Sequence, residues 1–356
     1  MSVPNLSDFL PMTGEKMLPD ERLRNEIHIR DPTIRNALSE FFGTALLLES
    51  CKPSFSEITW LLGWPSSCVV RGPATLYSFR SRATVVNVDG VPRTWRHSVI
   101  LKSFLAFIGL TIVMQFILSG EKLNTWIQIN IGWGLAITFC VYACSKTSGG
   151  HFNPAVSFAM LTLGRLSSKD FIIYCVVQTI GAFVGAMGAF GIYYDQFVKY
   201  AGSYRAIAGP NATAACFCSF PAPHITNLTC FFDQVAGTAL LVFFVCVIID
   251  KRNGIPNAAH PFLFGFVLIM IGTSLGMNLG YPINPARDLG PRIFAFFIYG
   301  AEVFTYHGYY FWIPVIAPLL GAVLAAWSYQ LFIGAHIPDE KHFSDLDETK
   351  TPLKTT

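Results

Sequence analysis

The tripeptide Asn-Pro-Ala occurs twice in this chain, at Asn153-Pro154-Ala155 and at Asn284-Pro285-Ala286. Each copy begins a short apolar segment, Pro154 to Leu163 or Pro285 to Phe297, and neither reaches the roughly twenty residues that a helix needs to cross a bilayer. Proline suits the first helical turn, and asparagine before it is a favoured N-cap. One Asn-Pro alone would indicate only a helix start. Two copies on half-length apolar segments indicate half-helices along a water-filled pore, because non-helical backbone is tolerated at membrane depth only there.

The composition also places the chain in a membrane. Hydrophobic residues make up 52% and charged residues 13%, with a mean hydropathy of +0.46, which is too little charge to coat a soluble surface. The net charge of +3 is too balanced to suggest a nucleic-acid partner. Nine cysteines without Cys-x-x-Cys pairs argue against a disulfide scaffold or a zinc site. Charged residues between Glu15 and Arg24 leave no apolar core for a cleavable signal peptide.

Apolar stretches of membrane-spanning length follow one another through the chain. Five are complete, and a sixth is divided into two pieces, residues 37–48 and 107–119, which are each too short to span alone. The sequence therefore predicts six membrane spans in addition to the two half-length segments. The complete spans are residues 126–145, 170–194, 231–249, 261–279 and 309–333.

A second repeat indicates that the chain consists of two related halves. Gly43-Thr-Ala-Leu-Leu47 recurs as Gly237-Thr-Ala-Leu-Leu241, each in the first span of its half. Three complete spans separate the two Asn-Pro-Ala copies, which stand 131 residues apart. Three is odd, so the copies enter the membrane from opposite faces and the half-helices meet N-terminus to N-terminus near the midplane. The expected fold is an all-α membrane protein with six transmembrane helices and two re-entrant half-helices in two inverted repeats.

Basic residues set the orientation of the spans. They cluster at four places that all fall on one side if both termini are cytoplasmic, and we expect a plasma-membrane protein. The segment 195–228 is then extracellular, and its Asn211-Ala-Thr sequence is a candidate glycosylation site. Two other acceptor sequences are less favourable: Asn227, which abuts the membrane, and the cytoplasmic Asn5. The basic clusters are the N-terminal tail, Arg165 with Lys169, the turn 250–254 and the C-terminal tail.

Two longer motifs resemble the aquaporin family, and specifically its aquaglyceroporin branch. They are Ser148-Gly-Gly-His-Phe-Asn-Pro-Ala-Val156 and Gly280-Tyr-Pro-Ile-Asn-Pro-Ala-Arg-Asp-Leu-Gly-Pro-Arg292. The resemblance covers residues 37–48 and 107–335. It implies a passive channel for glycerol and water that excludes ions and protons, needs no cofactor or metal, is not an enzyme, and forms a homotetramer with one pore in each subunit. The residues typical of the glycerol-conducting branch are Asp288, Tyr193, Arg292 and the pair Pro314-Val315.

The resemblance assigns a selectivity filter to Trp133, Gly272, Tyr281 and Arg287. Water-only channels usually have histidine at the Gly272 position, so glycine leaves room for a carbon chain, and a water-selective channel is the alternative. Tyr281 stands where glycerol channels often have phenylalanine. The two aromatic rings would face the C–H edge of glycerol, while the planar guanidinium of Arg287 would donate to its hydroxyls. Trp133 alone would more often be a packing residue or an interface anchor.

The motif loops supply the rest of the implied pore. Backbone carbonyls of residues 149–152 and 280–283 are expected to form a polar stripe opposite an apolar wall, so that solutes pass along acceptors without strong binding. At the centre, the amides of Asn153 and Asn284 would donate to the passing oxygen. Two helix N-termini, each equivalent to about half a positive charge, would oppose cations there together with Arg287. All six residues of the two tripeptides are assigned to the pore: Asn153, Pro154, Ala155, Asn284, Pro285 and Ala286.

Three polar residues are expected to support the re-entrant loops. By the resemblance, Glu40 accepts hydrogen bonds from the first loop, and Gln234 takes the equivalent place in the second half. Either residue could instead be a helix-end residue that faces headgroups. His151 is expected to orient the first loop, with a pH-sensing role as a weaker alternative. A disulfide stays open among three cysteines in or near the extracellular segment: Cys216, Cys218 and Cys230.

Residues 49–106 interrupt the first span. These 58 residues include seven basic residues and four prolines and have no counterpart in the family. One hypothesis is that they are translated from a retained or mispredicted intron or an alternative exon. If they are translated, the first span can be rebuilt from about Ser98 to Ser119, which places Lys102 within the span and removes Glu40 from its site.

The interruption leaves a second function open, that of a non-conducting variant that associates with normal subunits and modulates them. The sequence contains no plausible nucleophile–base pair or metal cluster, which argues against an intramembrane enzyme. The expected organisation is a cytoplasmic tail over residues 1–36, a channel domain over 37–335 that contains the interruption, and a cytoplasmic tail over 336–356.

Overall fold

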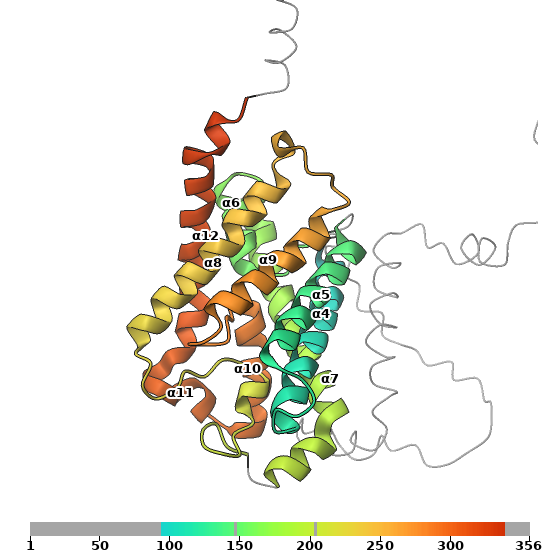
Figure 1. Ribbon diagram of the computed structural model, residues 1–356, viewed down its shortest axis with the longest axis vertical. Coiled ribbons are helices and arrows are strands. Elements are labelled where there is room, and N and C mark those ends of the chain that lie inside the picture. The colour runs from blue at the N-terminus through green and yellow to red at the C-terminus, as the bar shows by residue number, and fades with distance from the viewer. Residues whose placement is uncertain (1–93, 146–147, 203–204, 339–356) are drawn as a thin grey trace, which may run out of the picture.

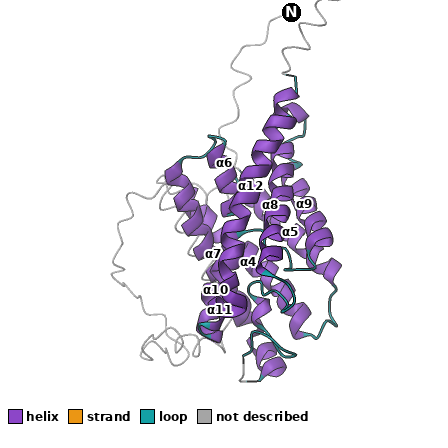
Figure 2. Ribbon diagram, turned by 90° about the vertical axis from the view of Figure 1, so that its left-hand side faces the viewer, coloured by secondary structure: helices purple, strands orange, loops and turns teal. Residues whose placement is uncertain are grey.

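The computed structural model describes residues 94–145, 148–202 and 205–338. Every regular element in these ranges is helical (Figure 2). Two short helices, α6 (Pro154–Thr162) and α10 (Pro285–Tyr299), begin at the two Asn-Pro-Ala motifs. They lie in opposite halves of the bundle (Figure 1). The six longer helices are α4 (Thr94–Leu118), α5 (Trp126–Cys144), α7 (Ser168–Ala201), α8 (Asn227–Ile249), α9 (His260–Leu275) and α12 (Ile313–Phe332).

The helix pairings follow the two inverted repeats. Helix α4 packs along α7 in the first half, as α8 packs along α12 in the second, and α5 lies against α9 where the halves meet. Each half-helix contacts the last long helix of the other half, α10 with α7 and α6 with α12. The fold predicted from the parity of the spans is therefore confirmed.

Glycines at equivalent places allow the two long pairs to approach closely. A β-carbon on Gly185 of α7 would overlap the carbonyl oxygen of Ser103 in α4, and one on Gly321 of α12 would overlap that of Val235 in α8. Only glycine permits these backbone contacts. Small residues at helix contacts are typical of membrane bundles, where lipid supplies no hydrophobic force between helices.

The first span is the rebuilt one. Helix α4 runs from Thr94 through Phe107 to Leu118 without a break, so its first thirteen residues come from the interruption rather than from residues 37–48. This confirms the rebuilt span expected from about Ser98 and places Lys102 inside the helix. The segment 37–48, including Glu40, lies outside the described residues.

The outer surface of the bundle is apolar. Large exposed side chains occur on several helices, among them Phe139 on α5, Ile172 on α7 and Phe232 on α8. Four described helical segments are long and apolar enough to cross a membrane, and shorter apolar helices cover Lys102–Leu118 and α9. The predicted last span, 309–333, begins later than expected because α11 (Glu302–Tyr309) and a 3-10 turn (Tyr310–Trp312) precede α12.

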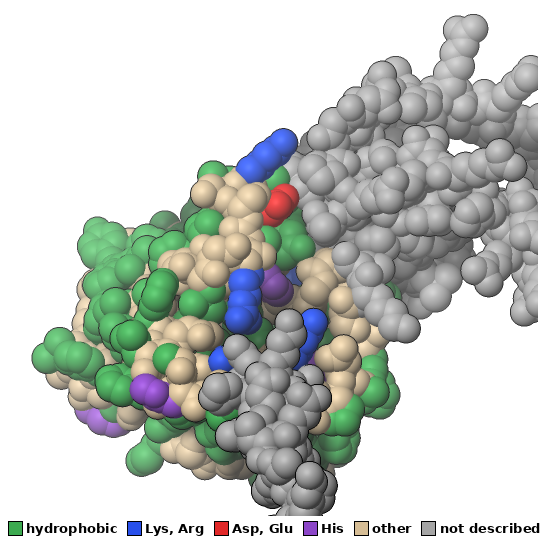
Figure 3. All heavy atoms as spheres, turned by 90° about the horizontal axis from the view of Figure 1, so that it is seen from above, with side chains coloured by type: hydrophobic (Ala, Val, Ile, Leu, Met, Phe, Trp, Pro, Cys, Tyr) green, Lys and Arg blue, Asp and Glu red, His purple; other side chains and the backbone are tan. Residues whose placement is uncertain are grey.

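The α8–α9 turn and the end of α12 meet at one end of the bundle. Asp250 accepts from Arg252 Nε at 2.9 Å and from Nη2 at 2.6 Å, and Tyr329 of α12 donates to the same carboxylate. The hydrogen bonds from Arg252 hold the pKa of Asp250 down, at about 2. Figure 3 shows Lys and Arg side chains on this end, which is the end predicted to be cytoplasmic.

Candidate functional site

A cavity of about 790 Å³ lies where the two half-helices begin. The lining includes both re-entrant loops, residues 149–153 and 280–284. It also includes apolar side chains, mainly from three long helices. The cavity lining therefore combines loop residues with hydrophobic side chains. The apolar lining includes Ile137 and Val141 of α5, Leu241 and Val245 of α8, and Phe264 and Leu268 of α9.

Both half-helices begin as the Asn-Pro pattern predicts. Asn153 and Asn284 have extended backbones and cap α6 and α10, with proline in the first turn of each helix. Asn153 Oδ1 accepts from the Ala155 amide at 2.9 Å, and Asn284 Oδ1 accepts from the Arg287 amide at 3.2 Å. The caps fix both side chains at the cavity centre.

The prolines and alanines of the two motifs do not line the cavity, whereas the asparagines do. Pro154, Ala155, Pro285 and Ala286 are all buried. The assignment of the whole tripeptides to the pore stays a prediction, in which the asparagines contribute to the lining and the prolines and alanines to packing. The proline and alanine form the first turn of each half-helix, which packs into the bundle. Ala155 and Ala286 are each 0% exposed, so their small side chains serve packing.

The two loops also bind each other through these asparagines. Asn153 Nδ2 donates to the Ile283 carbonyl at 2.9 Å, and Asn284 Nδ2 donates to the Phe152 carbonyl at 3.0 Å. The motifs, 131 residues apart in sequence, are thus in direct contact. An amide nitrogen carries two hydrogens, so each asparagine keeps a second N–H beyond this bond.

The loop backbones adopt conformations that most residues avoid. Phe152, Tyr281 and Ile283 have φ values of 49°, 43° and 34°, in the left-handed region. Such conformations persist where surrounding contacts hold them. Gln234 Oε1 accepts from the Ile283 amide at 2.9 Å, which is the loop-supporting contact predicted for this residue. His151 meets the Ser157 hydroxyl at 3.1 Å and packs edge-on against Tyr174, so it ties the first loop to α6 and α7.

Contacts connect the four predicted filter residues in two pairs, Arg287 with Trp133 and Gly272 with Tyr281. Trp133, Tyr281 and Arg287 line the cavity, whereas Gly272 lies behind the Tyr281 ring and is not part of the lining. The guanidinium carbon of Arg287 lies 5.1 Å from the centre of the Trp133 ring, and its Nη1 donates to the Phe217 carbonyl at 3.1 Å. A β-carbon on Gly272 would lie 2.6 Å from Cζ of Tyr281, so the missing side chain leaves space that the tyrosine ring fills.

Two further residues position Tyr281, and the sequence motifs did not mark either of them. Asn130 Oδ1 accepts from the Tyr281 hydroxyl at 2.6 Å. Trp126 packs edge-on against the same ring and donates from Nε1 to the Gly272 carbonyl at 3.2 Å. Both lie on α5, Asn130 three and Trp126 seven residues before Trp133. A polar residue fully buried in an apolar span is the signal that could have identified Asn130.

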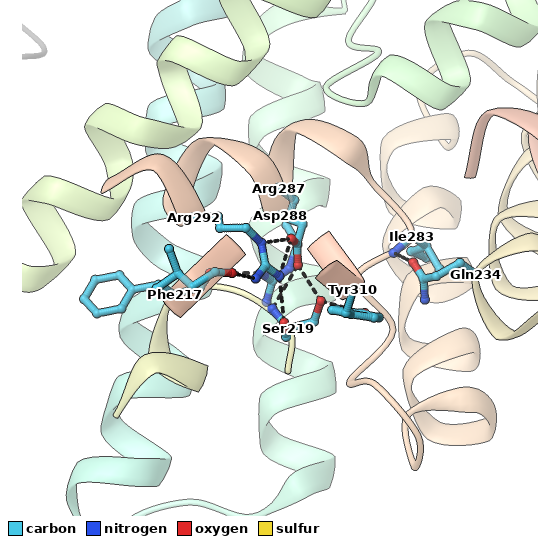
Figure 4. Close-up of polar contacts among 9 residues, drawn as sticks. Phe217, Ser219, Gln234, Ile283, Arg287, Asp288, Arg292 and Tyr310 are labelled. Carbon is cyan, nitrogen blue, oxygen red and sulfur yellow. Dashed lines mark hydrogen bonds and ion pairs between the residues drawn. The ribbon is translucent and has the colours of Figure 1, made fainter. Parts of the chain in front are cut away.

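Asp288 lies in a buried network beside the cavity rather than in its lining (Figure 4). It pairs with Arg292 at 2.7 Å and accepts from the Ser219 amide at 2.9 Å. Arg292 also donates to the carbonyls of Ser219 at 2.7 Å and Val303 at 2.8 Å. The aspartate that marks the branch thus ties α10 to the segment between α7 and α8. The thiols of that region, Cys216, Cys218 and Cys230, are free and buried, so the disulfide left open by the sequence is not formed there.

Lys102 also lies at the site, although the internal repeat does not predict a basic residue there. It lines the cavity from α4, and its Nζ donates to the Phe152 carbonyl at 2.6 Å. Among the described residues there is no group of His, Cys, Asp and Glu side chains that could hold a metal ion.

The family follows from comparison with known proteins. The family model described as Major intrinsic protein matches residues 97–329, which run from the first turn of α4 to the last turn of α12. The chain belongs to the major intrinsic protein family. The match begins at residue 97, inside the rebuilt first helix, so the expectation that residues 49–106 have no counterpart in the family is wrong for residues 97–106.

Relatives place this major intrinsic protein within its family. Aquaporin-9 of Mus musculus is 44% identical over 242 residues, 67% of this chain and 82% of that protein. Aquaporin-10 of Homo sapiens is 36% identical over 68% of this chain and 84% of that protein. The solved aquaglyceroporin of Plasmodium falciparum superposes with a TM-score of 0.61 at 26% identity and covers 68% of this chain and 97% of that chain. These similarities support the aquaglyceroporin branch, whose members are channels and not enzymes.

Proposed function

We propose that the cavity between α6 and α10 is the pore through which this aquaglyceroporin-type channel conducts glycerol and water. The observation that carries the proposal is the composition of the cavity lining, in which the loops 149–152 and 280–283 occur together with apolar side chains of α5, α8 and α9. Glycerol has a hydroxylated edge and a C–H edge, so it suits a lining that offers both polar backbone and apolar side chains. Weak, repeated contacts along such a lining permit rapid passage.

The filter selects by shape and hydrogen bonding. Trp133 and Tyr281 form an aromatic corner for the C–H edge of glycerol, and Arg287 donates to its hydroxyls. One donor group of Arg287 is held by the Phe217 carbonyl, which fixes the orientation of the guanidinium. The absent side chain of Gly272 lets the Tyr281 ring stay back from the path.

Charge at the centre opposes ions and protons. The N-termini of α6 and α10 meet at the asparagines, and each is equivalent to about half a positive charge. Arg287 adds a full positive charge along the same cavity. This field disfavours cations and protons while the asparagine amides still offer N–H groups to a neutral oxygen.

The protein spans the plasma membrane with both termini in the cytoplasm. The basic α8–α9 turn then lies on the cytoplasmic side with the end of α12, and the segment that contains Asn211 is extracellular. Exposed apolar side chains around the bundle suit contact with lipid and with three further copies in a homotetramer. The tails are residues 1–36 and 336–356, and the channel domain is 37–335.

A non-conducting, modulatory variant is the second candidate function. Lys102 favours it, because a cationic side chain occupies the cavity centre. A non-conducting protein would also result if residues 49–93 disturbed insertion of the chain into the membrane.

Shrinking or swelling of proteoliposomes separates these functions. The full-length chain is reconstituted and exposed to an impermeant osmolyte for water flux and to an inward glycerol gradient for glycerol flux, with protein-free vesicles as the control. Both fluxes are expected to exceed the control. Water flux without glycerol flux would reject the glycerol branch, and loss of both in correctly inserted protein would favour the non-conducting variant.

A further inference from the structure

Two basic side chains, Lys102 and Arg287, line the cavity, and neither belongs to an ion pair among the described residues. Lys102 is 1% exposed, and its Nζ donates to the Phe152 carbonyl at 2.6 Å. The ion pairs among the described residues are Arg252 with Asp250 and Arg292 with Asp288, and neither includes Lys102. An ionisable group at membrane depth is costly and is typically functional where it faces a cavity. The position of this ammonium therefore needs a functional account.

The second half of the molecule shows what the repeat has in this place. Thr44 and Thr238 are equivalent in the repeated Gly-Thr-Ala-Leu-Leu sequence. Lys102 stands 58 residues after Thr44, which is the length of the interruption, so it occupies the Thr44 place in the rebuilt helix. Thr238 is fully buried and short. The first half thus carries a long cation where the second half carries a small hydroxyl.

The ammonium uses an acceptor that a permeant would need. A carbonyl oxygen has two lone pairs. At Phe152 one lone pair accepts from Asn284 Nδ2 at 3.0 Å, and the other accepts from Lys102 Nζ at 2.6 Å. Both partners are donors, so the Phe152 carbonyl has no lone pair left for a passing solute, whereas the equivalent Ile283 carbonyl accepts from Asn153 Nδ2 and keeps its second lone pair.

We propose that Lys102 is a specificity-determining residue of the pore, which lowers glycerol flux relative to water flux; this inference rests on the proposed channel function. Glycerol carries three hydroxyl donors on one edge and must find acceptors for them together. Water can turn its oxygen to the ammonium and its hydrogens to the next carbonyl. The Lys102 side chain also takes up width at the junction, which a three-carbon solute needs more than water does.

Two substitutions separate the lost acceptor from the lost width. Lys102→Met keeps the length of the side chain and frees the Phe152 carbonyl, whereas Lys102→Thr also removes the length and reproduces the residue of the other half. One recovered hydrogen bond of ordinary strength corresponds to a factor of about two to ten. The matched control is Lys122→Thr, at an exposed lysine after the end of α4.

The measurement is the ratio of glycerol to water permeability in proteoliposomes, with inserted protein quantified. We expect a ratio about two- to tenfold higher in Lys102→Thr and no change in Lys122→Thr. A rise in Lys102→Met as well assigns the effect to hydrogen bonding, and a rise in Lys102→Thr alone assigns it to width. If the original chain conducts and neither variant at Lys102 changes the ratio, the inference is overturned. If the original chain and both variants fold, insert and conduct neither solute, the proposed pore is itself wrong.

Discussion

At the scale of single residues, the site is a set of side chains that are fixed before any solute arrives. Arg287 is held by the Phe217 carbonyl, and Tyr281 is held by Asn130. The absence of a side chain at Gly272 matters as much as either contact, because it decides where the Tyr281 ring can lie.

Substitution of Gly272 tests the filter. Gly272→His brings a ring into space that Asn130 and Tyr281 occupy, so Tyr281 must move toward the path. We expect glycerol permeability to fall by roughly tenfold or more, the effect of reshaping a selective pocket, while water permeability falls less. Stopped-flow light scattering on the same vesicles gives both values. An equal loss of both would show that Gly272 is a packing residue.

The motif residues of the site were predictable, and their supports were only partly so. Asn153, Asn284 and Gln234 make the cap and loop contacts that the sequence pattern indicated. A polar residue in an apolar span could have marked Asn130, but the contacts of Asn130 and Trp126 with Tyr281 were not predictable, because no spacing in the chain relates them to it. Their role depends on the packing of α5 against α9, which only three-dimensional structure shows. A motif also does not say which of its residues face the pore, since that depends on how each half-helix packs.

At the scale of the elements, helix α4 is the element that takes its first thirteen residues from the interruption. Residues 98–106 read Ser-Val-Ile-Leu-Lys-Ser-Phe-Leu-Ala, which is apolar enough to extend Phe107–Leu118 to the length of a span. Helix formation satisfies every backbone group of the span in lipid, whereas a span split at Leu48 would leave some of them unpaired. The cost of this solution is Lys102 in the membrane.

Deletion of residues 49–106 tests this view of the first span. The deletion joins Leu48 to Phe107, returns Glu40 to the span, and replaces Lys102 by Thr44. It removes a lysine that costs roughly 2.5–3.5 kcal/mol at a helix centre. We expect the folded yield and the glycerol permeability per inserted protein to rise together. If the full-length chain conducts glycerol as well as the deleted form at matched expression, the interruption is simply accommodated.

At the scale of the whole molecule, the account depends on two inverted halves. The pairing of α4 with α7 and of α8 with α12, and the exchange of half-helices between the halves, are what the odd number of spans predicted. The end of the second half was less predictable. Left-handed backbones at His307, Gly308 and Tyr309 turn the chain before α12 begins, and no periodic pattern marks such a turn.

Glycosylation tests the orientation of the whole bundle. Asn211 is exposed in the segment between α7 and α8, whereas Asn227 lies at the start of α8 and its Nδ2, the atom that would carry the glycan, donates to the His307 carbonyl at 3.1 Å. We expect a glycan on Asn211 and none on Asn227 when the protein is made in cells that glycosylate. A shift in gel mobility that Asn211→Gln abolishes and Asn227→Gln leaves in place would agree. The orientation is wrong if only Asn5 is modified.

The central claim is that glycerol passes through the cavity between the half-helices, and blockage of that cavity tests it most directly. Leu268 of α9 lines the cavity, whereas Leu324 of α12 is 52% exposed on the outer surface. Leu268→Cys, Leu324→Cys and the unsubstituted chain are treated with a bulky neutral maleimide, and glycerol permeability is measured before and after. We predict that labelling removes most of the glycerol flux in Leu268→Cys alone. Complete labelling of Cys at position 268 with undiminished glycerol flux would contradict the account.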